Sequence, residues 1–366
     1  MAARTDVLVV GTLYPTVGGI ASAIEDQVQA LRGRGLRVEV LNTGRRRRRR
    51  PGSVSFENGA EAALDAARVF GSAVRLRPRL VAVHTVASPV LPAVRALTLV
   101  GAARAAGAPV ITHIHAYDLR ESLTSGSSRY AAVLARLARW SARVVVLHDG
   151  VAADIRGVAP DASVVIVPNC VDCERYRPVD ITEGTARVVF VGTAGRRKGA
   201  VVLVEALARV RHPIVCDIAG GPAEEEQEAY DDLRRAGASL VASGRLEFHG
   251  EVDRERSLAL LQRASLFVLP SFAEGMPVAL LEAMACGVAA IVTDVGAMGD
   301  IVREAGCGLV VSPGDVDALA DAIDSLLGDD RRRSLMGAAG RKAILERHCC
   351  DAVGDTLAAL YRAVSR

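Results

Sequence analysis

The chain has 366 residues, of which 50% are apolar and 24% are charged, and its formal net charge is +3 at pH 7. This length is more than one hydrophobic core usually serves, and it suits two α/β domains. Because no stretch reaches the roughly 18 apolar residues of a membrane-spanning helix, and the first residues lack the regions of a signal peptide, we expect a cytoplasmic protein.

Short apolar runs bounded by turn residues alternate with helical patterns, which predicts parallel sheets joined by right-handed crossovers. The first six expected strands are Asp6–Val10, Val38–Asn42, Leu80–Thr85, Pro109–Ile114, Arg143–Leu147 and Ser163–Val167. The second six are Arg187–Val191, Ile214–Ala219, Leu246–His249, Leu266–Leu269, Ala289–Thr293 and Gly308–Val311. Two such sets predict two doubly wound, Rossmann-like domains that face a central cleft, with ligands beyond the carboxyl ends of the strands.

A polar stretch with Pro and Gly, Tyr176–Ala186, separates the two sets of strands. We therefore assign residues 1–178 to an N-terminal domain and residues 179–350 to a C-terminal domain. Helical patterns close the chain, and the last of them, residues 351–366, forms a terminal helix. The closing helices are expected at Val316–Leu327, Arg331–Cys350 and about Asp351–Arg366.

Six consecutive arginines, Arg45–Arg50, leave the rest of the chain at a net charge of −3, since 3 − 6 = −3. Such a run is either a patch for anionic lipid or nucleic acid, or a solvated loop. No aromatic residues interleave with the arginines, as a base-stacking surface would require, which favours the loop. We expect no nucleic-acid partner and no membrane contact.

Glycines and histidines mark the carboxyl ends of the first-half strands. Gly18 and Gly19 precede a helix that begins near Ile20, and paired glycines there allow a ligand to approach the helix start. His113 and His115 end a strand and project to the same face, with Asp118 close behind. His84, also at a strand end, is either a cleft residue or a buried, hydrogen-bonded one.

The turn after the first strand of the second half, Val191–Gly199, combines small residues with three cations. Arg196, Arg197 and Lys198 would neutralise a diphosphate on which negative charge grows as it leaves. The alternative is a basic turn that faces solvent. The turn lacks the spacing of a phosphate-binding P-loop, and no GxGxxG follows the first strand of either half, which counts against a nicotinamide dehydrogenase.

The most informative segment, Phe267–Glu282, reads as strand, loop and helix. Pro277 suits the first turn of the helix, and Glu282 lies about five residues further, roughly 7–8 Å along the axis. Glu274 stands in the loop. The two carboxylates therefore reach separate regions of one ligand, and the helix N-terminus between them suits a diphosphate.

Two further patterns are interpreted as structural. Cys170 and Cys173 form a CxxC, but no second pair completes a metal site, so we expect reduced thiols. Asp315-Val-Asp317 mimics a metal-binding DxD motif but precedes a helix that Asp would cap. We expect no metal and no cofactor other than the substrate itself.

The segment EGMPVALLE, residues 274–282, resembles the E-x7-E motif of the family-four retaining glycosyltransferases of the GT-B fold. The glycine pair, the basic turn, the HIH strand end and PNCVD at residues 168–172 are similar to that family in the expected order. The chain departs from the family at Thr193, where Arg is frequent, and at Cys170, where Gly is usual.

The resemblance implies a retaining, hexosyl-type transferase that uses a nucleotide-sugar donor and a small-molecule or lipid-linked acceptor. Glu282 would bind the ribose and Glu274 the sugar hydroxyls, while Lys198 with Arg197 or Arg196 would clamp the diphosphate. His115 would lie beside the transferred sugar. The terminal helix, residues 351–366, would pack back on the N-terminal domain. The backbone of Gly275, Met276 and Pro277 would meet the sugar and diphosphate, and Gly18 and Gly19 would border the phosphates or the acceptor.

Two other functions fit the same fold. One is a nucleotide-sugar 2-epimerase, which needs no separate acceptor. The other is a sugar-nucleotide-binding subunit that is inactive alone.

Overall fold

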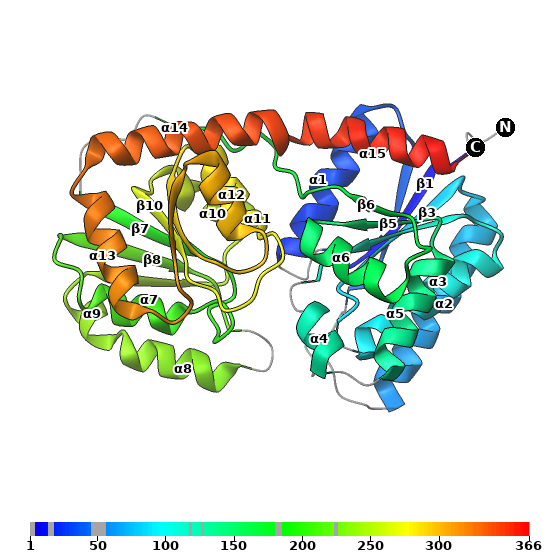
Figure 1. The fold of residues 1–366 in the computed structure, drawn as a ribbon, viewed down its shortest axis with the longest axis horizontal. Coiled ribbons are helices and arrows are strands. Elements are labelled where there is room, and N and C mark those ends of the chain that lie inside the picture. Colours follow the sequence, from blue (N-terminus) through cyan, green and yellow to red (C-terminus); the bar gives the residue numbers. More distant parts are fainter. Residues whose placement is uncertain are drawn as a thin grey trace. The chain divides into compact units, whose positions relative to one another are not determined.

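The computed structural model describes residues 4–13, 18–44, 56–88, 90–116, 119–125, 128–179, 185–222 and 226–365, with the backbone alone at 56–58. The Arg45–Arg50 run and Asp118 lie outside these ranges. The chain divides into two compact units, drawn in Figure 1. Unit 1 comprises Met1–Cys170 and Cys350–Arg366, and unit 2 comprises Val171–Cys349.

Unit 1 contains a six-stranded parallel sheet in the order β2-β1-β3-β4-β5-β6. Its strands are β1 Val7–Gly11, β2 Val38–Asn42, β3 Leu80–Thr85, β4 Val110–Ile114, β5 Arg143–Val146 and β6 Val164–Ile166. Its helices are α1 Gly19–Gly33, α2 Phe56–Leu76, α3 Val90–Ala105, α4 Leu119–Ser125, α5 Ser128–Trp140, α6 Asp149–Val158 and α15 Cys350–Val364.

Both faces of this sheet are buried, which explains why its central strands are continuously apolar. In β1, Leu8 and Val10 join one core cluster, while Val7 and Val9 join the other. The second cluster also contains Leu357 and Tyr361, so the C-terminal helix α15 covers the same face of the unit 1 sheet as α1.

Unit 2 repeats the plan with the order β12-β11-β10-β7-β8-β9. Its strands are β7 Ala186–Val191, β8 Ile214–Ala219, β9 Leu246–Gly250, β10 Leu266–Leu269, β11 Ala289–Thr293 and β12 Gly308–Val311. Its helices are α7 Ala200–Leu207, α8 Gln227–Ala236, α9 Ala238–Ala242, α10 Arg254–Gln262, α11 Val278–Ala285, α12 Met298–Ala305, α13 Val316–Leu327 and α14 Asp330–Arg347.

Each sheet has one point where the strand order reverses, and doubly wound sheets bind ligands at the carboxyl edge of that point. In unit 1 the reversal lies between β1 and β3, and in unit 2 between β7 and β10. The loops that the sequence singles out, after β1, β7 and β10, all leave the sheets at these two places.

The predicted fold class is confirmed within each unit, and all twelve expected strands are present with small differences at their ends. The sequence boundary after residue 178 differs from the structure, which groups residues 171–178 with unit 2. The reason is a long-range anchor, because the Arg341 guanidinium donates to the carbonyl oxygens of Cys173 and Tyr176. The helix expected over Arg331–Cys350 ends at Arg347, and α15 begins at Cys350.

Among the described residues, no helix combines the length and apolar character that crossing a bilayer requires.

Candidate functional site

Two adjacent loops of unit 2 form the candidate site. One follows β7 and spans Gly192–Gly199, and the other follows β10 and spans Pro270–Pro277. Gly199 has φ +69°, and a Cβ there would lie 2.0 Å from the carbonyl oxygen of Pro270. Only glycine therefore allows the two loops to approach so closely.

Glu274 lies at the centre of the two loops, and its side chain is buried. Its Oε1 atom accepts a charge-assisted hydrogen bond from Lys198 Nζ at 2.7 Å and another from Arg197 Nη1 at 3.0 Å. Ser271 donates to the same oxygen at 3.3 Å. The structure thus brings Glu274 together with Lys198 and Arg197, although Arg197 and Glu274 are 77 positions apart in the sequence.

The structure distinguishes the two arginines that the sequence left open. Arg197 lies between the loops, where its guanidinium also donates to the Ala273 carbonyl oxygen at 2.8 Å. Arg196 has an exposed side chain, and its backbone N–H donates to Glu226 at 2.9 Å. Arg197 is therefore the arginine whose charge is already at the site.

Burial lowers the pKa of Lys198, while the negative charge of Glu274 opposes that shift. Lys198 and Arg197 carry two positive charges against the one negative charge of Glu274, so the cluster keeps a net positive charge that attracts a second anion. The low dielectric around the largely buried Lys198 side chain strengthens that attraction. The pair of cations at Glu274 can therefore receive a diphosphate without a further side chain from outside the loops.

The segment after Glu274 leads into α11. Pro277 is the residue immediately before that helix rather than in its first turn, and Met276 is buried. The carbonyl oxygen of Gly275 accepts a hydrogen bond from the Ala297 backbone at 2.8 Å, which fixes the loop against the next one. The first turn of α11 presents backbone N–H groups and the positive end of the helix dipole.

Glu282 lies inside α11 and is buried, with its Oε1 atom 3.8 Å from Arg254 Nη2 of α10. Burial and the negative charge of Glu282 raise the pKa of the buried Tyr176. Sequence patterns gave no signal for Arg254, because nothing in its neighbourhood identifies it as the partner of a carboxylate on another helix.

Of the residues predicted for unit 1, the two glycines follow β1 at the reversal point of that sheet, whereas the predicted histidines lie at the end of β4. Gly18 precedes α1, which begins at Gly19, and a Cβ on either glycine would meet nothing within 4 Å. Among the residues that the structure describes, these glycines therefore relieve no close contact at the start of α1.

Three histidines form a buried stack at the ends of β3 and β4. The His84 ring lies 4.3 Å from that of His113 and 5.3 Å from that of His115. His84 Nδ1 and His115 Nε2 are 3.1 Å apart and form a hydrogen bond. The Tyr361 hydroxyl forms another with His113 Nε2 at 2.8 Å. His84 is thus buried and hydrogen-bonded, and it occupies one ring nitrogen of His115.

Burial keeps these histidines neutral. It lowers the pKa of His113 to about 3 and that of His115 to about 4, and it holds the pKa of His84 well below its usual value. An unfolded histidine has a pKa of about 6.5, so the unfolded chain takes up protons below that pH that the folded chain excludes.

We therefore expect the stability of unit 1 to be full above about pH 6.5 and to fall as the pH drops toward 4, by up to ~1.4 kcal/mol per pH unit for each histidine. Urea unfolding followed by the fluorescence of Trp140, the one tryptophan and a residue of α5, reports on this unit. His113→Gln should flatten the dependence, and His212→Gln, an exposed histidine of unit 2, should not. Equal stability at pH 7.5 and 5.5 would contradict the neutral stack.

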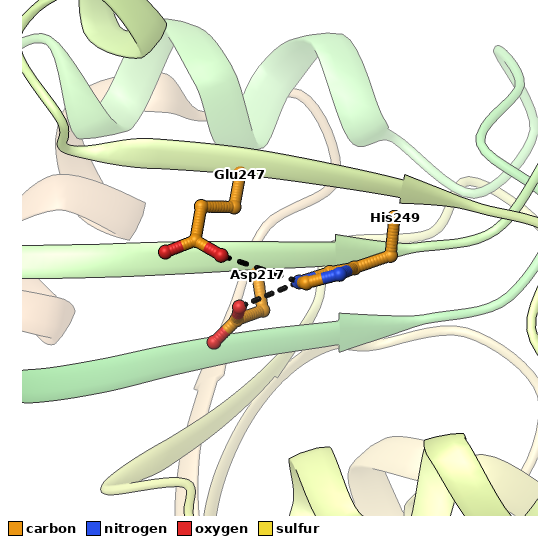
Figure 2. Close-up of side chains that lie close together, drawn as sticks. All are labelled: Asp217, Glu247 and His249. Carbon is orange, nitrogen blue, oxygen red and sulfur yellow. Dashed lines mark hydrogen bonds and ion pairs between the residues drawn. The ribbon is translucent and has the colours of Figure 1, made fainter.

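A polar cluster that the sequence did not reveal lies on β8 and β9 (Figure 2). One ligand atom each from Asp217, Glu247 and His249 lies within 4.8 Å of the others, a spacing that a metal ion can use. The Arg187 guanidinium, however, donates to both oxygens of Asp217 at 2.7 Å, and His249 Nε2 lies 2.7 Å from the same carboxylate. Asp217 is thus already paired, and the cluster links β7, β8 and β9 by charge.

The two patterns interpreted as structural behave as expected. Asp315 caps α13, since its side chain accepts from the Ala318 backbone at 2.9 Å, and Asp317 pairs with Arg209 at 3.4 Å. All seven cysteines are free thiols, including the buried Cys170 and Cys173.

Two family models match consecutive parts of the chain. The model described as Glycosyltransferase Family 4 matches residues 17–175, and the one described as Glycosyl transferases group 1 matches residues 174–343. The chain belongs to the family-four glycosyltransferases.

Curated relatives of this glycosyltransferase family match over part of their length. D-inositol 3-phosphate glycosyltransferase of Nocardia farcinica is 33% identical over 47% of this chain and 41% of its own. D-inositol 3-phosphate glycosyltransferase 1 of Catenulispora acidiphila is 27% identical over 71% of this chain and 68% of its own. Alpha-maltose-1-phosphate synthase of Mycolicibacterium smegmatis is 32% identical over 49% of this chain and 48% of its own.

Solved structures show the same GT-B fold. Sucrose-phosphate synthase from Thermosynechococcus elongatus aligns with a TM-score of 0.80 at 18% identity, over 98% of this chain and 99% of that one. HepE of Anabaena, in complex with UDP-glucose, aligns with a TM-score of 0.76 at 16% identity, over 98% of this chain and 99% of that one.

Proposed function

We propose that this family-four glycosyltransferase moves a sugar from a nucleoside diphosphate sugar to an acceptor hydroxyl, with retention of anomeric configuration and without a metal ion. The observation that carries the proposal is the convergence of Lys198, Arg197 and Glu274 at the reversal point of the unit 2 sheet. The names of the relatives, all sugar transferases or synthases, and the UDP-glucose bound to HepE support it.

In this proposal, the donor lies across the two loops of unit 2. Lys198 and Arg197 meet the diphosphate together with the first-turn N–H groups of α11, and Glu274 accepts hydrogen bonds from the sugar hydroxyls. Glu282, further inside the helix, accepts from the ribose hydroxyls. Each group thus meets the part of the donor that its charge suits.

The reaction breaks the bond between the anomeric carbon and the diphosphate oxygen and forms a bond from that carbon to the acceptor oxygen on the same face. The acceptor proton moves to the departing phosphate. Because negative charge develops on the diphosphate, the cations of Lys198 and Arg197 stabilise the transition state more than the bound donor. Glu274 holds hydroxyls and forms no covalent intermediate.

His115 has a restricted role in this scheme. Its Nε2 atom is already hydrogen-bonded to His84, so a contact with the sugar would use Nδ1 or the backbone. A neutral imidazole held in this way can donate or accept one hydrogen bond without carrying charge.

The test is a purified-protein assay that follows release of nucleoside diphosphate from a panel of donors, with and without acceptors. We expect release to require an acceptor and a glycosylated product to accumulate. A nucleotide-sugar 2-epimerase would instead convert the donor with no acceptor, and an inactive binding subunit would bind the donor without turnover.

We expect activity to survive EDTA, because Lys198, Arg197 and the α11 N-terminus supply the positive charge that a metal would otherwise supply. The NMR coupling of the anomeric proton should show retention. Loss of activity in EDTA with rescue by a divalent ion, or an inverted anomer, would contradict the mechanism. If His249→Gln removed such a metal response, it would locate the ion at the Asp217 cluster instead.

A further inference from the structure

A buried tyrosine and an arginine lie beside Glu282, and the proposed donor scheme uses neither of them. Tyr176 belongs to the segment between residues 171 and 178, and its side chain is fully buried. Arg254 is the first residue of α10, and its guanidinium carbon lies 5.9 Å from the centre of the Tyr176 ring. The same guanidinium lies 3.8 Å from Glu282 Oε1. A phenol and a cation from two other elements thus meet at the carboxylate of α11.

The hydroxyl of Tyr176 is the unusual group in this cluster. Among the described residues, no group meets it with the geometry of a hydrogen bond, although buried hydroxyls are rarely left without a partner. Burial, followed by the negative charge of Glu282, raises the pKa of Tyr176. The hydroxyl therefore keeps its proton, and the neighbouring carboxylate is an acceptor to which it can donate.

Tyr176 acts through its neighbours, because protein encloses its side chain and a ligand cannot reach it. A buried hydroxyl without a hydrogen bond costs free energy that a phenylalanine would not cost. A carboxylate has two oxygens and about four acceptor sites, more than two ribose hydroxyls would occupy. Glu282 can therefore accept from the tyrosine and from a ribose at the same time.

Arg254 stands where a positive charge does not favour the helix, since the N-terminus of α10 carries the positive end of the helix dipole. The helix start is capped without it, because the Asp253 side chain accepts from the Arg256 backbone N–H at 2.8 Å. A cation about 4 Å from a carboxylate, in contrast, offsets part of the cost of burying that charge. The place of Arg254 is thus explained by Glu282 rather than by α10.

The segment that carries Tyr176 is fixed to both helices that carry its partners. The Arg341 guanidinium donates to the carbonyl oxygen of Tyr176 at 2.7 Å and to that of Ala285, the last residue of α11, at 2.9 Å. The Gln262 side chain, at the end of α10, donates to the Arg177 carbonyl oxygen at 3.0 Å. The backbone around the cluster is therefore held in place before a ligand binds, which lowers the cost of binding.

We infer that Tyr176 and Arg254 are positioning residues for Glu282. Tyr176 donates to one carboxylate oxygen when the nucleotide binds, and Arg254 balances the charge, so that the remaining acceptor sites face the ribose. The inference rests on the proposed function, because it takes Glu282 as the residue that binds the ribose. It adds that the affinity for the nucleotide depends on two side chains that need not touch it.

The test is calorimetric titration of the full chain with ADP, CDP, GDP, UDP and dTDP, and of each variant with the tightest of them. Tyr176→Phe should weaken binding about tenfold and Arg254→Leu at least about tenfold, as expected when a bond to a charged group is lost. Arg254→Lys should recover part of the loss, because it restores the positive charge. Thermal unfolding of free Tyr176→Phe, followed by circular dichroism, should match that of the wild type, since that hydroxyl makes no standard hydrogen bond there.

A double-mutant cycle with Glu282→Ala separates positioning from a merely structural role. In the Glu282→Ala background, Tyr176→Phe and Arg254→Leu should each change the dissociation constant less than about twofold, because the carboxylate through which they act is gone. Losses that add in full to that of Glu282→Ala would overturn the inference, since the two residues would then act by another route.

The chain offers a matched control for each change. The guanidinium carbon of Arg175 also lies 5.9 Å from the centre of the Tyr176 ring, but this arginine pairs with the exposed Glu255 at 2.7 Å. Tyr230, a buried tyrosine of α8, is the control for loss of a hydroxyl. Arg175→Leu and Tyr230→Phe should both bind the nucleotide as the wild type does.

The outcomes distinguish this inference from the proposed function. Wild-type affinity in Tyr176→Phe or in Arg254→Leu would overturn the inference and leave the proposed function standing. If the wild type bound none of the five nucleotides, the proposed function would fail and the inference with it.

Discussion

Lys198→Ala should reduce turnover by about 10²–10³-fold while changing donor affinity far less. Lys198 Nζ lies 2.7 Å from Glu274 in the centre of the two loops, where a diphosphate would bring its charge. Its effect should be largest in the transition state, since the negative charge on the leaving group is greatest there. Steady-state rates at saturating donor, together with donor titration by calorimetry, separate the two quantities.

The chain offers a matched control because it has only one other lysine, Lys342, which is exposed on α14. Lys342→Ala should behave as the wild type does. Lys198→Arg should recover part of the lost rate, since it restores the charge with a different shape. Equal turnover in Lys198→Ala and the wild type would remove Lys198 from the mechanism.

Glu282→Ala should weaken binding of the free nucleotide and of the nucleotide sugar alike, by about 1.5–3 kcal/mol if a charge-assisted hydrogen bond to the ribose is lost. Glu282 is buried in α11 beside Arg254, so its carboxylate is held in place before the ligand arrives. Calorimetric titration with nucleoside diphosphate and with the intact donor measures both affinities.

Glu346→Ala, a half-exposed glutamate of α14, is the control for loss of charge alone. Glu274→Ala provides a contrast, since it should weaken the nucleotide sugar more than the free nucleotide. Normal binding of free nucleotide to Glu282→Ala would show that the ribose assignment is wrong.

The fold was predictable because the central strands are short apolar runs whose two faces are both buried, as Val7 to Val10 illustrate. The order of the strands could not be predicted, because the pairing of β7 with β10 joins segments that lie far apart in the sequence. That pairing is what places Lys198 beside Glu274. The sequence located both loops, but their contact depends on the sheet order.

The long-range partners of several side chains could not be predicted from the sequence for the same reason. Tyr361 meets His113 across 248 positions, and Arg187 meets Asp217 and Glu247 on two other strands. Nothing local to these residues identifies the partner. His84 is an intermediate case, because its place at a strand end was visible but its bond to His115 was not.

Binding of a nucleoside diphosphate sugar by this chain is the central claim, and a donor panel scored by thermal shift tests it most directly. A ligand at about 100 times its dissociation constant adds roughly 2.7 kcal/mol to stability, so a true donor should raise the melting temperature clearly. We predict that at least one nucleoside diphosphate sugar stabilises the wild type and that the same donor at the same concentration raises the melting temperature of Glu282→Ala clearly less. A panel that stabilises neither protein, or both equally, would contradict the account.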